Sequence, residues 1–158
     1  MTDDLTAHVI DGKYRVEQQL GRGGMGAVYL ATHLGTDRRV ALKVIHAALA
    51  SDPTYLARFR REARACGRLH HPNIVDVTDF DVCQHGDGQL AYLVMEYLDG
   101  CTLGDVLDNE RVPPVAWTID ILEQVSSAVE VAHREGIPHR DLNPTISGSN
   151  RIVVAAIR

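Results

Sequence analysis

Four glycines within six positions give this chain a segment that could bind phosphate. They are Gly21, Gly23, Gly24 and Gly26, and they lie within the stretch from Leu20 to Tyr29. A glycine has no Cβ, so its backbone can turn sharply and can approach phosphate oxygens closely. The spacing therefore predicts a phosphate-binding loop.

The residues around the glycines indicate which kind of phosphate loop this is. A dinucleotide-binding glycine turn opens a helix, whereas the residues after Gly26, from Ala27 to Ala31, favour a β-strand. The chain also lacks the Gly-Lys-Ser/Thr sequence of the other common phosphate loop. The remaining possibility is a phosphate-binding glycine turn between two β-strands.

The pattern Gly21-x-Gly23-x-x-Gly26-x-Val28, followed by Val40-Ala41-Leu42-Lys43, resembles the glycine-rich loop and third-strand lysine of protein kinases. The bacterial, eukaryotic-like Ser/Thr kinases are the most similar members of that family. The resemblance implies an α+β fold: a kinase N-lobe with a five-stranded antiparallel sheet and a C-helix, followed here by only the first helices of the C-lobe. It also implies ATP as the ligand.

The expected strands around the loop cover residues 14–20, 27–32 and 38–45, with a turn at 35–37. Alternation along the strands places Ala41 and Lys43 on one face, beside Val28. In the family this face covers the adenine and the phosphates. The resemblance makes Leu20, Val28 and Ala41 its upper wall.

A helix is predicted to begin at Ser51-Asp52-Pro53 and to end before Pro72. Its apolar residues recur at helical spacing: Leu56, Phe59, Ala63, Cys66 and Leu69. It resembles the family's C-helix, in which Glu62 would pair with Lys43 and hold it against the α- and β-phosphates. The alternative is a local pair between Glu62 and Arg58.

Residues 90–100 closely resemble the family's fifth strand and hinge. The match makes Met95 the gatekeeper behind the adenine, and it assigns the bonds to the base edge to the Glu96 C=O and the Leu98 N–H. An ordinary buried strand that ends at a glycine turn explains the same residues. Only the accompanying motifs favour the hinge.

Two further helices are expected, a short one at 102–107 and a longer one from Pro113-Pro114 to about Gly136. The longer helix has an apolar stripe predicted to face the core: Ile119, Leu122, Val125, Val129 and Ala132. His139-Arg140-Asp141-Leu142 follows and resembles the kinase catalytic loop. By resemblance Asp141 would accept the proton of the substrate hydroxyl.

The resemblance fails immediately after this loop. Asn143 stands where the family has a lysine, and Ile146 stands where an asparagine binds magnesium; no Asp-Phe-Gly or Ala-Pro-Glu follows. The apolar floor of the nucleotide pocket would fall at Gly148, unless Ile146 or Ile152 replaces it. The magnesium ligands are missing and we expect no metal site, so ATP binding should be weak and independent of magnesium.

Composition limits the possible functions further. The 158 residues are 23% charged and 45% apolar, with a net charge of −5, which suits a soluble globular protein and gives no electrostatic footprint for nucleic acid. Cys66, Cys83 and Cys101 are an odd number of cysteines, which argues against a disulfide framework. An acidic start without a signal sequence and the lack of a membrane-length apolar run favour the cytoplasm.

The expected organisation is a flexible N-terminus at 1–9, a kinase N-lobe and hinge at 10–98, the start of a C-lobe at 99–144 and a divergent tail at 145–158. We expect a truncated Ser/Thr kinase domain that is inactive as an isolated chain. One alternative is a non-catalytic, pseudokinase-like module that associates with an intact kinase through its N-lobe. The other is a functionless gene remnant.

Overall fold

The computed structural model describes residues 4–24, 26–109, 113–137, 144–147 and 151–155. The chain divides into two compact units. Unit 1 consists of Met1–Arg64 and Val77–Tyr97, and unit 2 consists of Ala65–Asp76 and Leu98–Arg158. The segment between residues 65 and 76 thus groups with the second unit, whereas the sequence assigned all of 10–98 to the first.

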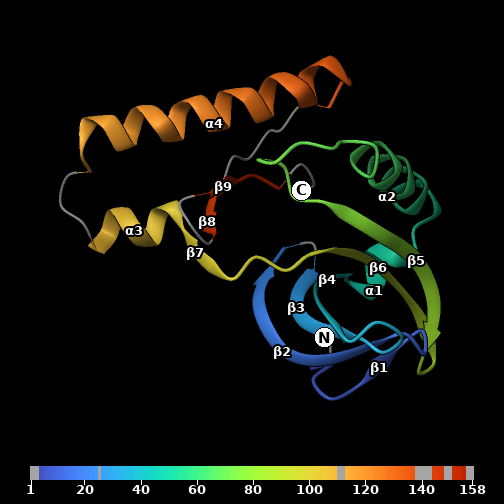
Figure 1. Ribbon diagram of the computed structural model, residues 1–158. Helices are drawn as coiled ribbons and strands as arrows, with labels where there is room; N and C mark the ends of the chain where they lie inside the picture. The colour runs from blue at the N-terminus through green and yellow to red at the C-terminus, as the bar shows by residue number, and fades with distance from the viewer. Residues whose placement is uncertain (1–3, 25, 110–112, 138–143, 148–150, 156–158) are drawn as a thin grey trace. The chain divides into compact units, whose positions relative to one another are not determined.

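Unit 1 is built on a six-stranded antiparallel sheet in the order β1-β2-β3-β4-β6-β5 (Figure 1). The strands are β1 (Val9–Ile10), β2 (Tyr14–Gly23), β3 (Gly26–His33), β4 (Arg38–Ile45), β5 (Val77–His85) and β6 (Gly88–Glu96). Five of them are the expected strands of a kinase N-lobe. The sixth, β1, has two residues, too few for an alternating pattern to reveal it.

Left-handed residues close the hairpins between these strands. Asp37 has φ 53° in the turn before β4, and Gly86 has φ 57° in the two-residue turn between β5 and β6. The first of these turns lies where the sequence predicted it, at residues 35–37. A two-residue loop with a left-handed glycine matches the twist of the strands that it joins.

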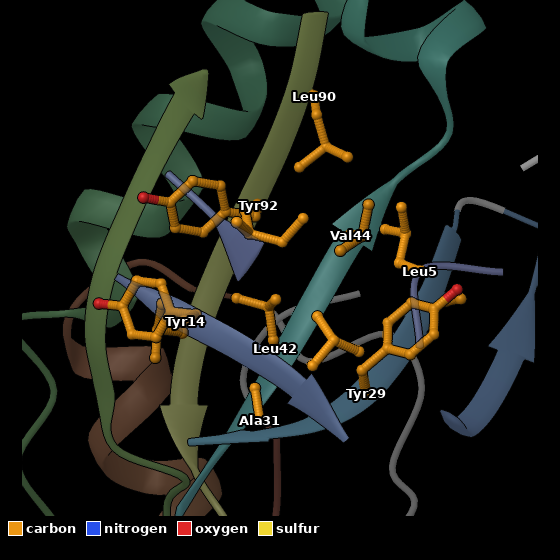
Figure 2. Close-up of a cluster of buried hydrophobic side chains, with 12 residues drawn as sticks. Leu5, Tyr14, Tyr29, Ala31, Leu42, Val44, Leu90 and Tyr92 are labelled. Atoms are coloured by element: carbon orange, nitrogen blue, oxygen red, sulfur yellow. The ribbon is translucent and has the colours of Figure 1, made fainter. Parts of the chain in front are cut away.

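The core of unit 1 lies on one face of the sheet, where alternate residues of the strands point inward (Figure 2). Its members are Leu5, Ile10, Tyr14, Val16, Ala27, Tyr29, Ala31, Leu42, Val44, Leu90, Tyr92 and Val94. Leu5 is only 4% exposed. The N-terminal segment, expected to be flexible, is therefore packed at this position because Leu5 supplies an apolar side chain to the core.

The sheet curves so that β1 and β2, at one end of the strand order, approach β5 and β6, at the other end. Tyr14 Oη donates a hydrogen bond to Asp79 Oδ2 at 2.8 Å, and Tyr92 Oη donates one to Asp11 Oδ2 at 2.8 Å. We call these two contacts the seam. Figure 2 shows both hydroxyls pointing out of the core in the same direction.

Two helices follow β4: α1 (Ala47–Ala50), which the sequence did not predict, and α2 (Pro53–Cys66). Asp52 Oδ1 accepts a hydrogen bond from the Thr54 N–H at 2.8 Å, which is the expected N-cap. The stripe predicted for this helix is confirmed for Phe59, Ala63 and Cys66, which are buried, whereas Leu56 is half-buried and the buried Leu69 lies beyond the end of the helix. The helix ends at Cys66, before Gly67 and well before Pro72.

Unit 2 contains the helices α3 (Leu103–Asn109) and α4 (Val115–Arg134) and the strands β7 (Gly100–Thr102), β8 (Thr145–Ser147) and β9 (Arg151–Val153). The strands form an antiparallel sheet in the order β7-β8-β9. At the end of α4, the Gly136 N–H bonds to the His133 C=O and the Ile137 N–H to the Ala132 C=O. With Gly136 at φ 72°, this is a Schellman C-cap.

The buried face of α4 differs from the predicted stripe. Ala128 and Ala132 pack with Leu69, Ile74 and Val154, with Val125 at the border of the cluster. Ile119 and Leu122, predicted to face the core, are 50% and 59% exposed. The prediction was wrong for these two residues because apolar side chains occur on more than one side of this helix, so periodicity alone does not choose the packed side.

The segment from residue 145, which the sequence analysis set apart as a divergent tail, forms β8 and β9 in the part that the structure describes. Ile146 pairs with Cys101 on one side and with Ile152 on the other. Asn73 Nδ2 donates hydrogen bonds to the Ile152 C=O at 2.7 Å and to Gln124 Oε1 at 2.8 Å. Residues distant in the sequence thus hold β9 in unit 2.

Candidate nucleotide-binding site

The glycine turn joins the ends of β2 and β3, where Gly23 pairs with Gly26. A Cβ at Gly26 would lie 1.9 Å from the Val44 carbonyl oxygen, so the backbones approach too closely for any other residue. By contrast, a Cβ at Gly21, Gly23 or Gly24 would meet nothing within 4 Å, and none of the three has a left-handed φ. These three glycines leave open space above the backbone rather than permit an unusual turn.

Strand register brings the predicted wall and the lysine together on the sheet face opposite the core. Val28 is the partner of Lys43, and Ala41 is the partner of Met95 across the next pair of strands. Directly paired residues share a face of a sheet. The alternation predicted from the sequence is therefore confirmed for Val28, Ala41 and Lys43.

Leu20, which precedes the glycine turn, lies outside the regular pairing of β2 with β3. The register of β2 against β3 shifts between Gln19 and Gly21, which leaves Leu20 as an extra residue in a β-bulge. Its side chain is 44% exposed. A bulge redirects a side chain away from the regular pleat, so Leu20 offers apolar surface to solvent at the edge of the candidate site.

The structure corrects the predicted partner of Glu62. Lys43 and Glu62 both lie in the described part of the chain, and they do not form an ion pair. Instead, Glu62 Oε1 accepts a hydrogen bond from Arg58 Nε at 2.8 Å, one turn earlier on α2. The local i,i+4 geometry satisfies Glu62 without any movement of the helix.

Lys43 is consequently a half-buried cation without an ion-pair partner in the described part of the chain. Burial lowers the pKa of its ammonium group, and the negative charge of Glu62 opposes this shift without cancelling it. A partly desolvated cation gains more from a bound anion than a fully hydrated one does. Lys43 is therefore suited to bind a negatively charged group on this face.

The expected hinge follows directly from the strand that carries Met95. β6 ends at Glu96, and the Arg39 guanidinium lies over the Tyr97 ring, 4.6 Å from its centroid. This cation–π contact, which no sequence pattern indicated, ties the start of the hinge to β4. Leu98 is half-buried and belongs to unit 2.

The predicted catalytic residue is not placed by this structure. Asp141, Asn143 and Gly148 lie outside the described residues. Of the two residues considered for the pocket floor, Ile146 is half-buried in β8 and Ile152 is fully buried in β9. Within the described part of the chain, no three His, Cys, Asp or Glu side chains form a metal-binding group.

The described helices also bear on membrane association. None of them combines the length and apolar character required to span a bilayer.

Comparison with known proteins agrees with this architecture. The family model for the protein kinase domain matches residues 14–145. Among curated proteins, the chain is 41% identical over 150 residues to the serine/threonine-protein kinase PknB of Mycobacterium leprae and 44% identical over 143 residues to pkn3 of Myxococcus xanthus. These matches cover 93% and 90% of this chain, but 24% and 26% of the relatives. The chain thus spans about a quarter of these curated relatives.

The solved kinase domain of PknI from Mycobacterium tuberculosis is similar in structure. The crystal structure of a single-substitution mutant of this domain matches with a TM-score of 0.79 and 35% identity, covering 97% of this chain and 62% of that chain. Since the match covers nearly all of the chain, the structural likeness continues into the segment after residue 145. The alignment to PknB of Mycobacterium leprae covers 93% of this chain, so it also extends past residue 145.

Proposed function

This chain belongs to the protein kinase domain family, and on that premise we propose that unit 1 binds ATP on the sheet face that carries Lys43. The observation that carries the proposal is the register of β3 and β4, which sets Lys43 beside Val28 and next to the glycine turn. No carboxylate of the described residues forms an ion pair with its cation, and the charge of Glu62 only partly opposes the effect of burial on its pKa. A triphosphate would supply the missing negative charge.

The family assigns a role to each part of this face. The backbone of the glycine turn would cover the phosphates, and Lys43 would bond the α- and β-phosphates. Met95 would lie behind the adenine, while the Glu96 C=O and the Leu98 N–H would bond its edge. The openness of the backbone above Gly21, Gly23 and Gly24 supports this arrangement, because phosphate oxygens need that approach.

We further propose that this chain alone does not transfer phosphate at a useful rate. Asn143 and Ile146 occupy the positions of the family's lysine and its magnesium-binding asparagine, and an isoleucine side chain has no atom that could bind magnesium. Losing one preorganised charge contact costs about 3 kcal/mol, or roughly 10² to 10³ in rate. Asp141 would then have no activated phosphate to act on.

Two measurements on the 158-residue chain test these proposals. Isothermal titration with ATP should show one site per chain and the same affinity with and without magnesium. A γ-phosphate transfer assay with a generic Ser/Thr substrate should give no product above background. Absence of ATP binding would overturn the first proposal, and phosphate transfer by the purified chain would overturn the second.

A second candidate function is that of a non-catalytic module that associates with an intact kinase. The exposed side of α4 favours it, since Val115, Ile119 and Leu122 are 76%, 50% and 59% exposed. Large apolar side chains gathered on one helix face typically mark an interaction surface. Co-elution with an intact Ser/Thr kinase domain, lost in Leu122→Glu, would support this function; no co-elution would argue against it.

A further inference from the structure

The two edges of the unit 1 sheet also meet through a pair of histidines. His8 lies just before β1, and His85 is the last residue of β5. Their rings lie 5.3 Å apart between centroids and are tilted by 45°. His8 Nδ1 and His85 Nε2 are 3.2 Å apart. At this distance one nitrogen donates a hydrogen bond to the other, because two facing lone pairs would repel each other.

We propose that His8 and His85 form a binding site for a divalent transition-metal ion of the zinc, nickel or copper class. Two imidazole nitrogens on one tetrahedral zinc ion, each at about 2.0–2.1 Å, stand about 3.3 Å apart. The observed separation of 3.2 Å is close to this spacing. The ion would replace the proton of the hydrogen bond between the two rings.

Little rearrangement is needed for a metal ion to replace the proton between the two rings. The ring that donates the hydrogen bond moves its proton to its other nitrogen, so both facing nitrogens present lone pairs. Each ring then tilts by about 35°, so that both lone pairs point to a tetrahedral centre beside the line between the nitrogens. His8 is exposed and His85 is half-buried, so solvent can deliver the ion.

The surrounding residues determine the class of ion and the strength of binding. Imidazole nitrogens suit zinc, nickel and copper, whereas magnesium and calcium prefer oxygen. The described part of the chain offers no three-ligand cluster, so water would complete the coordination shell. Cys83, two residues before His85, packs against the core cluster of unit 1, so we do not include it among the ligands.

Metal binding would fasten the N-terminal segment to the hairpin of β5 and β6. The two ligands are 77 positions apart in the sequence, so an unfolded chain holds them together far less well than the folded one. An ion that prefers the folded state stabilises it by RT ln(1 + [M]/Kd). The effect is independent of ATP and of the function proposed above.

Thermal unfolding of the 158-residue chain, made without a histidine tag, tests the proposal. Zinc chloride should raise the unfolding midpoint until one ion is bound per chain. His8→Gln and His85→Gln should each weaken zinc binding at least about tenfold, since one ligand of two is lost while hydrogen-bonding capacity is kept. His70→Gln, which alters an exposed imidazole of unit 2, is the control and should bind zinc normally.

A spectrum of the unaltered chain keeps the proposal testable if the variants fail to fold. Electron paramagnetic resonance with one equivalent of Cu²⁺ should show coupling to two imidazole nitrogens. Coupling to fewer nitrogens, an absence of stabilisation by zinc, or unchanged zinc affinity in both variants would each overturn the proposal.

Discussion

At the scale of single residues, the four glycines of the turn have two different physical roles. Gly26 is required by packing, since a Cβ there would lie 1.9 Å from the Val44 carbonyl oxygen. Gly26→Ala should therefore lower the free energy of unfolding by about 1–3 kcal/mol, as other overpacked sites do. Urea denaturation would measure the loss.

Gly23→Ala is the matched control, because its new methyl group meets nothing within 4 Å. Its free energy of unfolding should change by less than about 0.5 kcal/mol. Its ATP affinity should nevertheless fall, since the methyl group occupies the space proposed for the phosphates. Equal losses of stability in the two variants would show that packing at Gly26 does not have the role described.

Asn73 joins two parts of unit 2 through its side-chain amide. Its Nδ2 donates to the Ile152 C=O and to Gln124 Oε1. Asn73→Ala should cost about 1–3 kcal/mol, because a buried carbonyl is left without its donor. Asn109→Ala removes an exposed amide that bonds the Asp105 C=O and should cost less than about 0.5 kcal/mol. Calorimetric unfolding compares the two; similar losses would contradict the role of Asn73.

Residue-level prediction from the sequence succeeded where neighbours along a strand decide the outcome. Alternation placed Val28, Ala41 and Lys43 on one face, and the register confirms it. It failed for Glu62, which pairs with Arg58 instead of Lys43. The family motif implied a partner on strand β4, but a guanidinium one turn away on the same helix is always within reach.

At the scale of the secondary-structure elements, α4 presents different apolar residues to the core and to solvent. Ile121 is 7% exposed, whereas Leu122 is 59% exposed. Ile121→Ala should cost about 2–5 kcal/mol by loss of buried volume. Leu122→Ser should change the free energy of unfolding by less than about 0.5 kcal/mol.

Co-elution of Leu122→Ser with an intact Ser/Thr kinase domain tests what the exposed face does. If Leu122 belongs to the proposed interaction surface, Leu122→Ser should reduce this co-elution. A strong loss of stability in Leu122→Ser would instead mean that this side of α4 is packed.

The two long helices differ in how well the sequence predicted them. In α2, arginines occupy much of the surface away from the stripe, so Phe59 and Ala63 stood out as the core face. In α4, valine, isoleucine, leucine and alanine occur on several sides. Tertiary contacts with Leu69, Ile74 and Val154 choose the packed side, and the sequence of α4 does not contain them.

At the scale of the whole molecule, the seam makes the stability of unit 1 sensitive to alkaline pH. Burial, together with the bonded aspartates, raises the pKa of Tyr14 and Tyr92 well above the usual value. Above about pH 10, the unfolded chain loses phenolic protons that the folded chain keeps. The free energy of unfolding should therefore decline as the pH rises beyond that value.

Urea denaturation between pH 8 and pH 11 would measure this decline. The pKa of Lys43 is lowered, so below its usual pKa this group makes the free energy of unfolding rise with pH. The decline is therefore measured as a difference between variants, in which the contribution of Lys43 cancels. The Tyr14→Phe and Tyr92→Phe double variant should lose less stability over this range than the unaltered chain. An identical decline in both would show that the two phenols are not responsible.

The motifs predicted the general architecture of the chain. They did not predict the seam of unit 1 or the strands β8 and β9 of unit 2. Glycine and proline signals placed the strands, the turns and the starts of α2 and α4. The seam and the strands β8 and β9 depend on contacts between distant residues, such as Tyr14 with Asp79 and Asn73 with Ile152. Such pairs leave no periodic signal in a single sequence.

The central claim is that Lys43 is a half-buried cation that binds the phosphates of ATP. The most direct test is the thermal unfolding midpoint with and without ATP, for Lys43→Met and for the matched control Lys13→Met, which changes the only other lysine. Lys43→Met should raise the midpoint without ATP, since it removes a cation that burial disfavours, and should abolish the stabilisation by ATP. Lys13→Met should keep that stabilisation. Stabilisation by ATP that persists in Lys43→Met would contradict the claim.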